Sequence, residues 1–421
     1  MVNKYNAPKG TEDLYGPSAR MWDYCMDVAR DVFERAGYEP IYTPIFELTE
    51  VFTRGIGEAT DVVGKEMYTF EDKGGRSMTL RPENTAGVVR AAINASLTAN
   101  NAAAKLYYGG PQFRHERPQK GRQRQFYQIG AELLGYDSPE ADAEIIGLLW
   151  HYFVELGIPP SSMRMLVNSM GCKNCRPTYR DSIERFILTN ADDLCAECVR
   201  RADTNPLRAL DCKNESCREV LSEAPRLMDA LCAPCADHDK QVRVLLDLVG
   251  IPFEQDDSLV RGLDYYTRTV FEIQTDDGQG AQNAIGGGGR YDGLFEALGG
   301  KPTPGIGFAL GFERAALALE AVGIDMAIGS DCDIYVACAT DDLRARAFSV
   351  ADTLREDGMY AQSDLGDRTL KAQMKAANKA GAAFVAILAP DEDAQGGVTL
   401  RDMHTKDEVF MTYDALLNLP E

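Results

Sequence analysis

KLYYGGPQFRHERPQKGRQRQFYQIGAELL, residues 105–134, carries the strongest structural signal in the sequence. Its two ends, 105–114 and 123–134, are typical of β-strands. Five cations lie within eleven residues of the loop between them: Arg114, Arg117, Lys120, Arg122 and Arg124. Arginine grips phosphate with a fork of donors, so a loop of this kind can wrap a nucleotide, and Phe126 is placed to stack on a base. A basic loop that is merely solvated is the alternative interpretation.

A second signal lies at residues 304–317, PGIGFALGFERAAL, where we expect a strand to lead into a helix. Three glycines in it precede Arg314, which falls on the first turn of that helix. Glycine-rich turns of this kind, with an arginine, suit phosphate contact. The stretch is not a Walker loop, because no Gly-Lys-Ser/Thr follows, and its spacing does not fit a dinucleotide fingerprint.

Composition excludes several classes of protein. Of 421 residues, 45% are hydrophobic and 26% charged, which is ordinary for a globular chain. No apolar run is long enough to span a membrane, and the start, MVNKYNAPKG, has no apolar signal core, so we expect a cytoplasmic protein. The formal charge of −21 argues against general adhesion to nucleic acid, although a local basic patch could still bind it.

The pattern of helices and strands changes along the chain. A helix is expected over 18–36, a hairpin with a Gly-Gly turn over 66–81, and another helix over 139–156. From 331 onward strand and helix patterns alternate, which predicts a separate α/β domain of about 90 residues with a partly parallel sheet.

Cysteines mark an insertion. Eight of the eleven fall between 172 and 235, in a segment, 172–238, that is expected to be mainly helical. Taken in sequence order they form C-x2-C-x19-C-x2-C and C-x4-C-x14-C-x2-C, both similar to four-cysteine zinc spacings: Cys172, Cys175, Cys195, Cys198, then Cys212, Cys217, Cys232, Cys235. Structural zinc is one interpretation, and eight thiols packed as small apolar residues is the other.

Together these stretches resemble the class II aminoacyl-tRNA synthetases. The basic loop looks like their motif 2, the glycine-rich stretch like motif 3, and GYEPIYTPIFE (37–47) like motif 1. LVRGLDYYTRTVFE (259–272) and GGGRYDGL (287–294) resemble the signature peptides of the histidyl-tRNA synthetase family, and TLRPENTAG (79–87) fits it too. The resemblance covers essentially the whole chain in the family's order.

The resemblance implies an α+β fold. It consists of an antiparallel sheet flanked by helices in a catalytic domain (1–325), the helical insertion, and a C-terminal α/β anticodon-binding domain (331–421). It implies a ligase that forms histidyl-adenylate and pyrophosphate from L-histidine and ATP, then charges tRNA-His and releases AMP. Mg²⁺ is expected on the ATP phosphates, and motif 1 implies a homodimer.

The resemblance also implies residue roles. Arg114 and Arg261 are expected at the α-phosphate as the catalytic arginines, and Arg261 takes the place of a metal ion. The other ATP-binding residues are expected to be Glu116 at the adenine amino group, Arg122 at the outer phosphates, and Phe126 and Arg314 stacking on adenine. The histidine-binding set is Glu83, Thr85 and Gln128 for the α-amino and carboxylate groups, Glu132 and Tyr266 for the imidazole, Tyr265 and Tyr291 lining the pocket, and Arg261. Neutral imidazole offers one donor and one acceptor, so a pocket that pairs both should reject isosteres without an editing domain.

For tRNA, the sequence offers a basic stripe in the C-terminal domain. Residues 368–390 contain no acid, and a helix would place four cations on roughly one face: Arg368, Lys371, Lys375 and Lys379. A solvated face is the alternative. In the motif 2 loop, Arg117 and Gln119 are expected to touch the acceptor end.

Three other functions compete. A regulatory subunit of histidine biosynthesis would share the histidine pocket but lack the C-terminal domain and tend to lose the ATP arginines. A class II synthetase for glycine, proline or threonine would not carry the two signature peptides. A pure RNA-binding protein would leave Glu83, Glu132 and Tyr266 unexplained.

Overall fold

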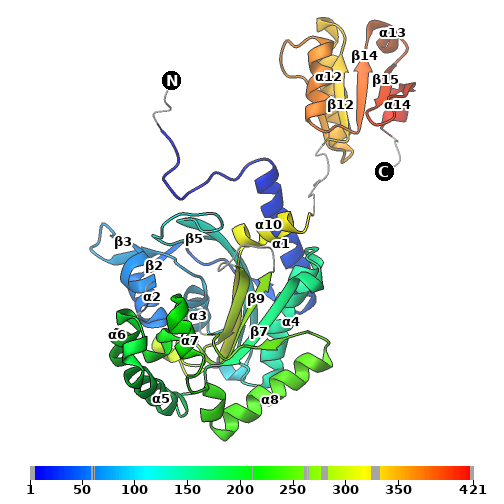
Figure 1. Cartoon of the computed structure of the whole chain (residues 1–421). Coiled ribbons are helices and arrows are strands. Elements are labelled where there is room, and N and C mark those ends of the chain that lie inside the picture. The colour runs from blue at the N-terminus through cyan, green and yellow to red at the C-terminus, as the bar shows by residue number, and fades with distance from the viewer. Residues whose placement is uncertain are drawn as a thin grey trace. The chain divides into compact units, whose positions relative to one another are not determined.

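The computed structural model describes residues 5–57, 60, 62–210, 212–259, 263, 265–275, 283–323 and 332–417. The chain folds into two compact units, Met1–Asp325 and Met326–Glu421 (Figure 1). In the described part of the chain, no helix is both long and apolar enough to cross a membrane.

A large, mostly antiparallel sheet forms the centre of the first unit. Within the described ranges its strands run in the order β1 (Glu39–Pro40), β5 (Ala104–Phe113), β6 (Gln125–Leu134), β11 (Gly305–Gly311), β10 (Ala284–Arg290), β9 (Thr267–Thr275), β7 (Met163–Ser169) and β8 (Glu254–Gln255). The edge strands β1 and β8 pair in parallel with their neighbours, and all other pairs are antiparallel. The predicted antiparallel sheet is confirmed, and so are the two strands on either side of the basic loop.

One face of this sheet packs on helices. Apolar residues of α1 (Pro17–Arg35), α4 (Pro139–Glu155), α8 (Ala233–Leu248) and α10 (Phe312–Ala321) form a core with every second residue of the central strands. In β6 those residues are Ile129, Ala131 and Leu133. Because side chains alternate along a strand, Gln128 and Glu132 face the other way.

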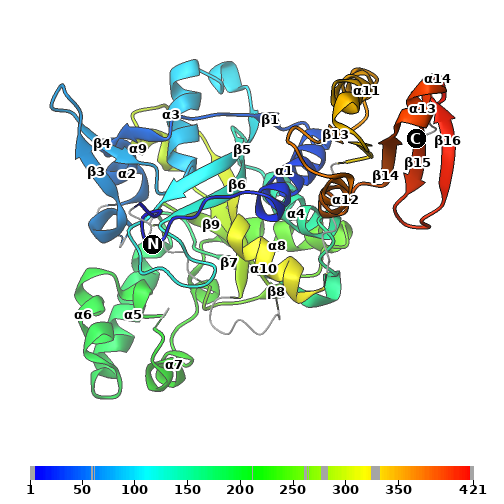
Figure 2. The same ribbon diagram turned by 90° about the horizontal axis from the view of Figure 1, so that it is seen from above.

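The opposite face of the sheet is covered only in part. α3 (Thr85–Ala95) and α9 (Leu294–Ala297) pack there against β5 and β6, with α2 (Thr49–Ile56) beside them. Figure 2 shows α2, α3 and α9 on one side of the molecule, away from α1, α8 and α10. Glycines of β10 and β11 line the uncovered part, and a Cβ on Gly307 would collide with the carboxylate of Glu132. This bare face is the floor of the site described below.

A small antiparallel sheet lies beside α2. Its strands run in the order β2 (Phe46–Leu48), β4 (Ser77–Leu80) and β3 (Tyr68–Glu71), and a π-helical turn, η1 (Val62–Glu66), precedes β3. The β3–β4 hairpin turns at Gly74 and Gly75, as predicted; Gly75 has φ 74°, which glycine adopts without strain.

The insertion is helical, as the sequence indicates. It contains α5 (Arg176–Thr189), α6 (Ala196–Thr204) and α7 (Glu215–Leu221), with the short 3-10 turns η4 (Ala191–Asp193), η5 (Pro206–Ala209) and η6 (Leu227–Ala230). These elements share a small apolar core of their own. Figure 1 shows them clustered, with α8 leading back to the main sheet. α8 continues to Leu248 and packs on α4, so the returning helix belongs to the core of the large sheet.

The C-terminal unit is an α/β domain. Its sheet has the order β13 (Ala361–Ser363), β12 (Ile334–Cys338), β14 (Phe384–Leu388), β15 (Gly397–Asp402) and β16 (Glu408–Thr412). β13, β12 and β14 are parallel and the others antiparallel, which confirms the partly parallel sheet. α11 (Arg344–Glu356) and α12 (Leu370–Lys379) pack in separate apolar clusters against β12, and α13 (Pro390–Ala394) and α14 (Tyr413–Leu416) complete the unit.

Candidate active site

A cavity of about 270 Å³ opens on the bare face of the large sheet. It is bounded by β6, β9, β10 and β11 and by the first turns of α3 and α10. Most of the predicted ATP and histidine residues line it: Glu83, Thr85, Arg114, Glu116, Arg122, Phe126, Gln128, Tyr265, Tyr266, Tyr291 and Arg314. Segments far apart in the sequence therefore meet in one place.

Three arginines gather at one end of the cavity. Arg114 donates from Nε to the carbonyl of Pro82 at 2.8 Å, and its guanidinium lies 5.3 Å from the centre of the Phe126 ring. Arg314 stands on the first turn of α10, as predicted, and donates to the carbonyl of Ala284 at 2.8 Å. Burial lowers the pKa of Arg314, and the positive charge of Arg122 lowers it further. Guanidinium stays charged, so an anion is the ligand that would relieve this crowding.

Glu116 and Arg122 pair with each other. Arg122 Nε lies 2.6 Å from Glu116 Oε2. The sequence assigned them separate contacts on a nucleotide, and both side chains line the cavity. A nucleotide that engages both must therefore exchange this ion pair for its own contacts.

The other end of the cavity suits a small ammonium group. Glu83 is buried and accepts from the backbone N–H groups of Thr85 at 2.7 Å and Ala86 at 3.1 Å, at the start of α3. Burial raises the pKa of Glu83, and these N–H groups oppose that rise. Gln128 Oε1 is buried and has no hydrogen-bond partner among the described residues. A buried unpaired acceptor that lines the same cavity as a carboxylate calls for a donor from a ligand.

Glu132 is not among the side chains that line this end of the cavity, but it contacts three that do. It is fully buried and accepts from three hydroxyls, those of Tyr291 at 2.5 Å, Thr85 at 2.6 Å and Tyr108 at 3.2 Å. Burial raises the pKa of Glu132 to about 8, although Thr85 and Tyr291 oppose the rise. Tyr108, which also lines the cavity, was missed from the sequence, although the period of two along β5 places it on this face.

Three tyrosines form the wall. The Tyr265 ring centre lies 4.6 Å from that of Tyr266 and 5.7 Å from that of Tyr291. Arg261, the remaining predicted catalytic residue, lies outside the described residues.

A buried network of polar side chains connects to Tyr291, one of these three tyrosines. Asp142 of α4 accepts from Thr269 Oγ1 at 2.5 Å and from Arg290 Nε at 3.0 Å, and His238 Nε2 lies 2.6 Å away. Burial opposes ionisation of Asp142, but His238 and Arg290 hold its pKa below the usual value. Arg290 is completely buried and directly precedes Tyr291. No pattern in the sequence indicates that His238 and Asp142 meet.

Comparison with known proteins agrees with this geometry. The family model for histidyl-tRNA synthetase matches residues 10–315, and that for the anticodon binding domain matches residues 333–419. The histidine--tRNA ligase of Halothermothrix orenii is 46% identical over 403 residues, 96% of each chain. The chain belongs to the histidyl-tRNA synthetase family.

Other members of this family agree over similar lengths. The histidine--tRNA ligase of Desulforamulus reducens is 46% identical over 401 residues, 95% of each chain. The crystal structure of apo histidyl-tRNA synthetase from Staphylococcus aureus superposes with a TM-score of 0.82 at 35% identity and covers 98% of each chain. The family resemblance read from the sequence is thereby confirmed.

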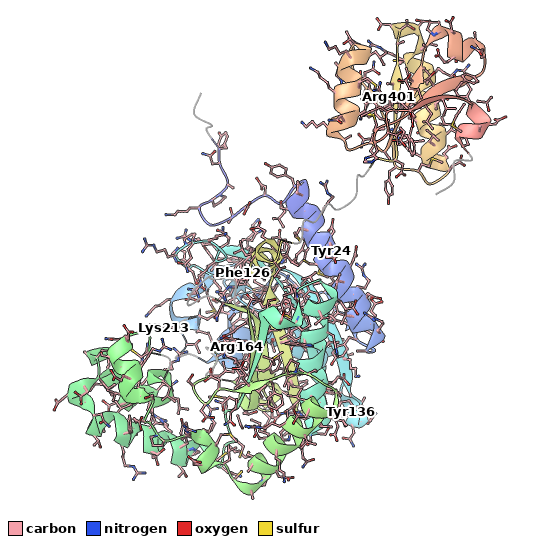
Figure 3. All side chains as sticks on the ribbon, turned by 45° about the vertical axis from the view of Figure 1, so that its right-hand side comes forward. Tyr24, Phe126, Tyr136, Arg164, Lys213 and Arg401 are labelled. Atoms are coloured by element: carbon pink, nitrogen blue, oxygen red, sulfur yellow. The ribbon has the colours of Figure 1, made fainter. Side chains whose placement is uncertain are left out.

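The anticodon-binding unit carries a basic cleft of about 410 Å³. Lys371 and Lys375 of α12 line it, together with Arg401 (labelled in Figure 3) and Lys406. Arg401 comes from β15 and Lys406 from the turn after it, so neither belongs to the single helical stripe that the sequence predicts. The stripe itself needs correction, because α12 begins at Leu370, so Arg368 precedes the helix and pairs with Asp364.

The remaining predicted tRNA residues line neither cavity. Lys379 is the last residue of α12 and lies outside the basic cleft. Arg117 and Gln119 are exposed in the motif 2 loop, and Gln119 forms an isolated antiparallel bridge with Arg122.

The cysteines form two groups that the sequence spacing did not predict. The outer cluster consists of Cys172, Cys175, Cys232 and Cys235, and the inner cluster of Cys195, Cys198, Cys212 and Cys217. In each cluster all sulfurs lie within 4.8 Å of one another, and no disulfide is formed. Grouping in chain order was wrong because the chain leaves through α5 and returns through α8, which nests one group inside the other.

Proposed function

We propose that this chain ligates L-histidine to tRNA-His with ATP, through a histidyl-adenylate intermediate, and releases pyrophosphate and AMP. The observation that carries the proposal is a single cavity with an arginine end and a histidine end. A carboxylate bound at the second end would face an α-phosphate bound at the first. The family and its relatives named histidine--tRNA ligase support the same activity.

The step needs positioning and charge compensation. The histidine carboxylate attacks the α-phosphate in line, the bond to the β-phosphate breaks, and pyrophosphate leaves. Negative charge then accumulates on the phosphate oxygens, and Arg114 and Arg122 offer fixed donors toward it. Phe126 and Arg314 would hold the adenine, with Glu116 at its amino group. We assign Arg261 to the α-phosphate by its place in the signature peptide.

Mg²⁺ would enter with the ATP phosphates and offset their charge. Three carboxylates line the arginine end, and they differ in suitability. Glu116 is paired with Arg122, and Glu313 accepts from the N–H of Tyr127, while burial raises its pKa to about 7. Glu272 on β9 accepts from Gln274 Nε2 at 2.9 Å, so a cation bound next to the phosphates would have to share whichever carboxylate it uses with a contact already made.

Histidine would bind with its ammonium group against Glu83 and Gln128. Thr85 is the third residue that we assign to the amino and carboxylate groups. Tyr266 and Glu132 would face the imidazole between Tyr265 and Tyr291. Since Glu132 already accepts from three hydroxyls, one of them must give way when the imidazole N–H arrives.

Amino-acid-dependent exchange of labelled pyrophosphate into ATP, without tRNA, tests the proposal with each of the twenty amino acids. We expect exchange with histidine alone. Exchange with another amino acid would overturn the assignment of the pocket. Histidine binding without any exchange would instead favour a regulatory subunit, which the arginines and the anticodon-binding unit argue against.

Charging of tRNA should depend on the second unit as well. The basic cleft of Lys371, Lys375, Arg401 and Lys406 suits RNA phosphates, and we keep Arg368 and Lys379 as flanking contacts and Arg117 and Gln119 as acceptor-end contacts. Replacing Lys371 and Lys375 with alanine should weaken tRNA charging and leave pyrophosphate exchange intact.

The protein is proposed to act as a cytoplasmic homodimer. Large apolar side chains are exposed along motif 1 and the neighbouring hairpin: Tyr42, Ile45, Phe46, Leu48 and Phe70. Such a patch is typical of a contact surface. Sedimentation at equilibrium should give twice the mass of the chain.

The cysteine clusters are proposed to bind structural zinc. Sγ–Sγ distances in the outer cluster are 3.7 Å for Cys172–Cys232 and Cys172–Cys175, and 3.9 Å for Cys175–Cys235. Tetrahedral coordination with Zn–S bonds of about 2.3 Å separates sulfurs by about 3.8 Å. Less than about 0.5 equivalents of zinc in protein purified without chelator would contradict this proposal.

A further inference from the structure

The two cysteine clusters differ in what they join. The inner cluster links α6, α7 and the chain between them, all within the insertion. The outer cluster links the segment after β7 to the start of α8, where the chain leaves and re-enters the catalytic unit. The outer cluster therefore lies at the base of the insertion, next to the sheet.

The first half of the outer cluster is bonded to the start of β9, which directly follows Tyr266. The N–H of Arg268 donates to the carbonyl of Gly171 at 2.9 Å, and the N–H of Met170 donates to the carbonyl of Arg268 at 2.5 Å. Arg176, one residue beyond Cys175, donates from Nη1 to the carbonyl of Tyr266 at 3.1 Å. Tyr266 lines the cavity, so the backbone that aims its ring is held by the residues around Cys172 and Cys175.

This contact is tight and conformationally demanding. Gly171 has φ +58°, and a Cβ there would lie 2.6 Å from Cys175 Sγ. Its partner Arg268 also has a positive φ, 49°, which is unfavourable for a residue other than glycine. Such a conformation persists only when its surroundings hold it.

The second half of the cluster connects to Tyr291, another tyrosine of the same wall. His238 lies three residues after Cys235 on α8, with Nε2 2.6 Å from Asp142 Oδ2. Asp142 also accepts from Arg290, which directly precedes Tyr291. Both pairs of cysteines thus connect by short paths to tyrosines of the histidine site.

We infer that the outer cluster is a thiolate zinc site that positions the histidine pocket, whereas the inner cluster only stabilises the insertion. Zinc would clamp the segment after β7 to the start of α8, and so fix Tyr266 through Gly171 and Arg176, and Tyr291 through His238 and Asp142. This inference rests on the proposed histidine activation. It makes the four outer cysteines positioning residues, which do not touch substrate.

Two matched double variants test it in the full-length protein. C172S/C232S removes the two part-buried thiols of the outer cluster, and C195S/C212S removes the two part-buried thiols of the inner cluster. Zinc content is measured for both variants and the wild type, and KM for histidine and for ATP is measured by pyrophosphate exchange. We expect about two zinc ions in the wild type and about one in each variant.

The kinetic result should separate the clusters. In the outer variant KM for histidine should rise by about tenfold or more while KM for ATP changes by less than about twofold. The inner variant should keep both KM values and lose only thermal stability. Equal effects of the two variants on histidine KM, or an unchanged histidine KM after loss of the outer zinc, would overturn the inference.

Arg176→Gln keeps the test valid if the outer variant does not fold. It removes the guanidinium contact with the carbonyl of Tyr266 and leaves all eight thiols in place. We expect two zinc ions and a raised KM for histidine. An unchanged histidine KM would contradict the positioning role, whereas absence of exchange by the wild type would instead contradict the proposed function.

Discussion

At one end of the cavity, Arg114, Arg122 and Arg314 approach one another with their charges only partly compensated. At the other end, Glu132 is fully buried and each of its bonds comes from a hydroxyl in a fixed place. The first arrangement attracts a highly charged ligand and tolerates variation in its shape. The second has little net charge and demands one pattern of donors and acceptors. Affinity for the nucleotide and selection of the amino acid therefore rest on different physical interactions.

Arg114→Gln should produce the largest effect on activity, a loss of rate that arises at the arginine end of the cavity. Removing one donor from the developing phosphate charge should lower kcat for pyrophosphate exchange by about 10³-fold. The affinity for histidine, measured by calorimetry without ATP, should change by less than about tenfold, because Arg114 acts on Glu83 only through its charge. Lys120→Ala, in the same loop and exposed, is the matched control and should retain exchange. An equal loss of histidine affinity in Arg114→Gln would show that the two ends are not separable.

Glu132→Gln should weaken histidine binding and leave ATP binding unchanged. A carboxyl group carries at most one proton, whereas an amide brings two N–H donors toward hydroxyls that now donate to oxygen, so the tyrosine wall loses its alignment. We expect KM for histidine to rise by about 10²-fold, with KM for ATP unchanged. Glu144→Gln is the control, because Glu144 also accepts from a tyrosine, Tyr38 at 3.0 Å, but away from the cavity. A variant that binds histidine normally would remove Glu132 from the specificity network.

The sequence predicted the arginine end better than the histidine end. Arg114, Arg122 and Arg314 lie in continuous motifs, and the helix that carries Arg314 begins where its glycines indicate. Glu132 was placed on the right strand, but its depth depends on Tyr108, Thr85 and Tyr291, which meet only in the folded chain. Local sequence patterns predict a helix or strand and which of its faces is buried. They do not predict which side chains from different elements contact one another.

The same limit explains why two other predictions, the grouping of the cysteines and the basic stripe, were wrong. Spacing showed that the cysteines come in pairs, but which pairs join depends on the return of the chain through α8. The basic stripe was traced along one helix, while the cleft draws Arg401 from a neighbouring strand. Which distant segments meet depends on the topology of the fold, and the spacing of residues along the chain does not reveal it.

The buried carboxylate should also leave a mark on the pH dependence of stability. The pKa of Glu132 is about 8 in the folded chain, above its unfolded value near 4.5, so the fold binds a proton that the unfolded chain has released. Stability contributed at Glu132 is therefore fully present below about pH 4.5 and is lost as pH rises toward 8. Relative to Glu132→Gln, the wild type should lose about 2 kcal/mol between pH 6 and pH 8 in urea unfolding without histidine. Parallel curves for the two proteins would mean that Glu132 titrates normally.

Salt should affect ATP binding but not histidine binding, and this is the smallest of the expected effects. Arg122 is about half exposed, with 47% of its side chain accessible, so ions in solution can screen it, whereas the hydroxyl contacts of Glu132 are buried. Raising potassium chloride from about 50 mM to about 500 mM should increase KM for ATP about threefold and leave KM for histidine unchanged. Pyrophosphate exchange at fixed Mg²⁺ measures both values in the same assay. A parallel rise in both would mean that charge, and not the hydroxyl network, governs histidine binding as well.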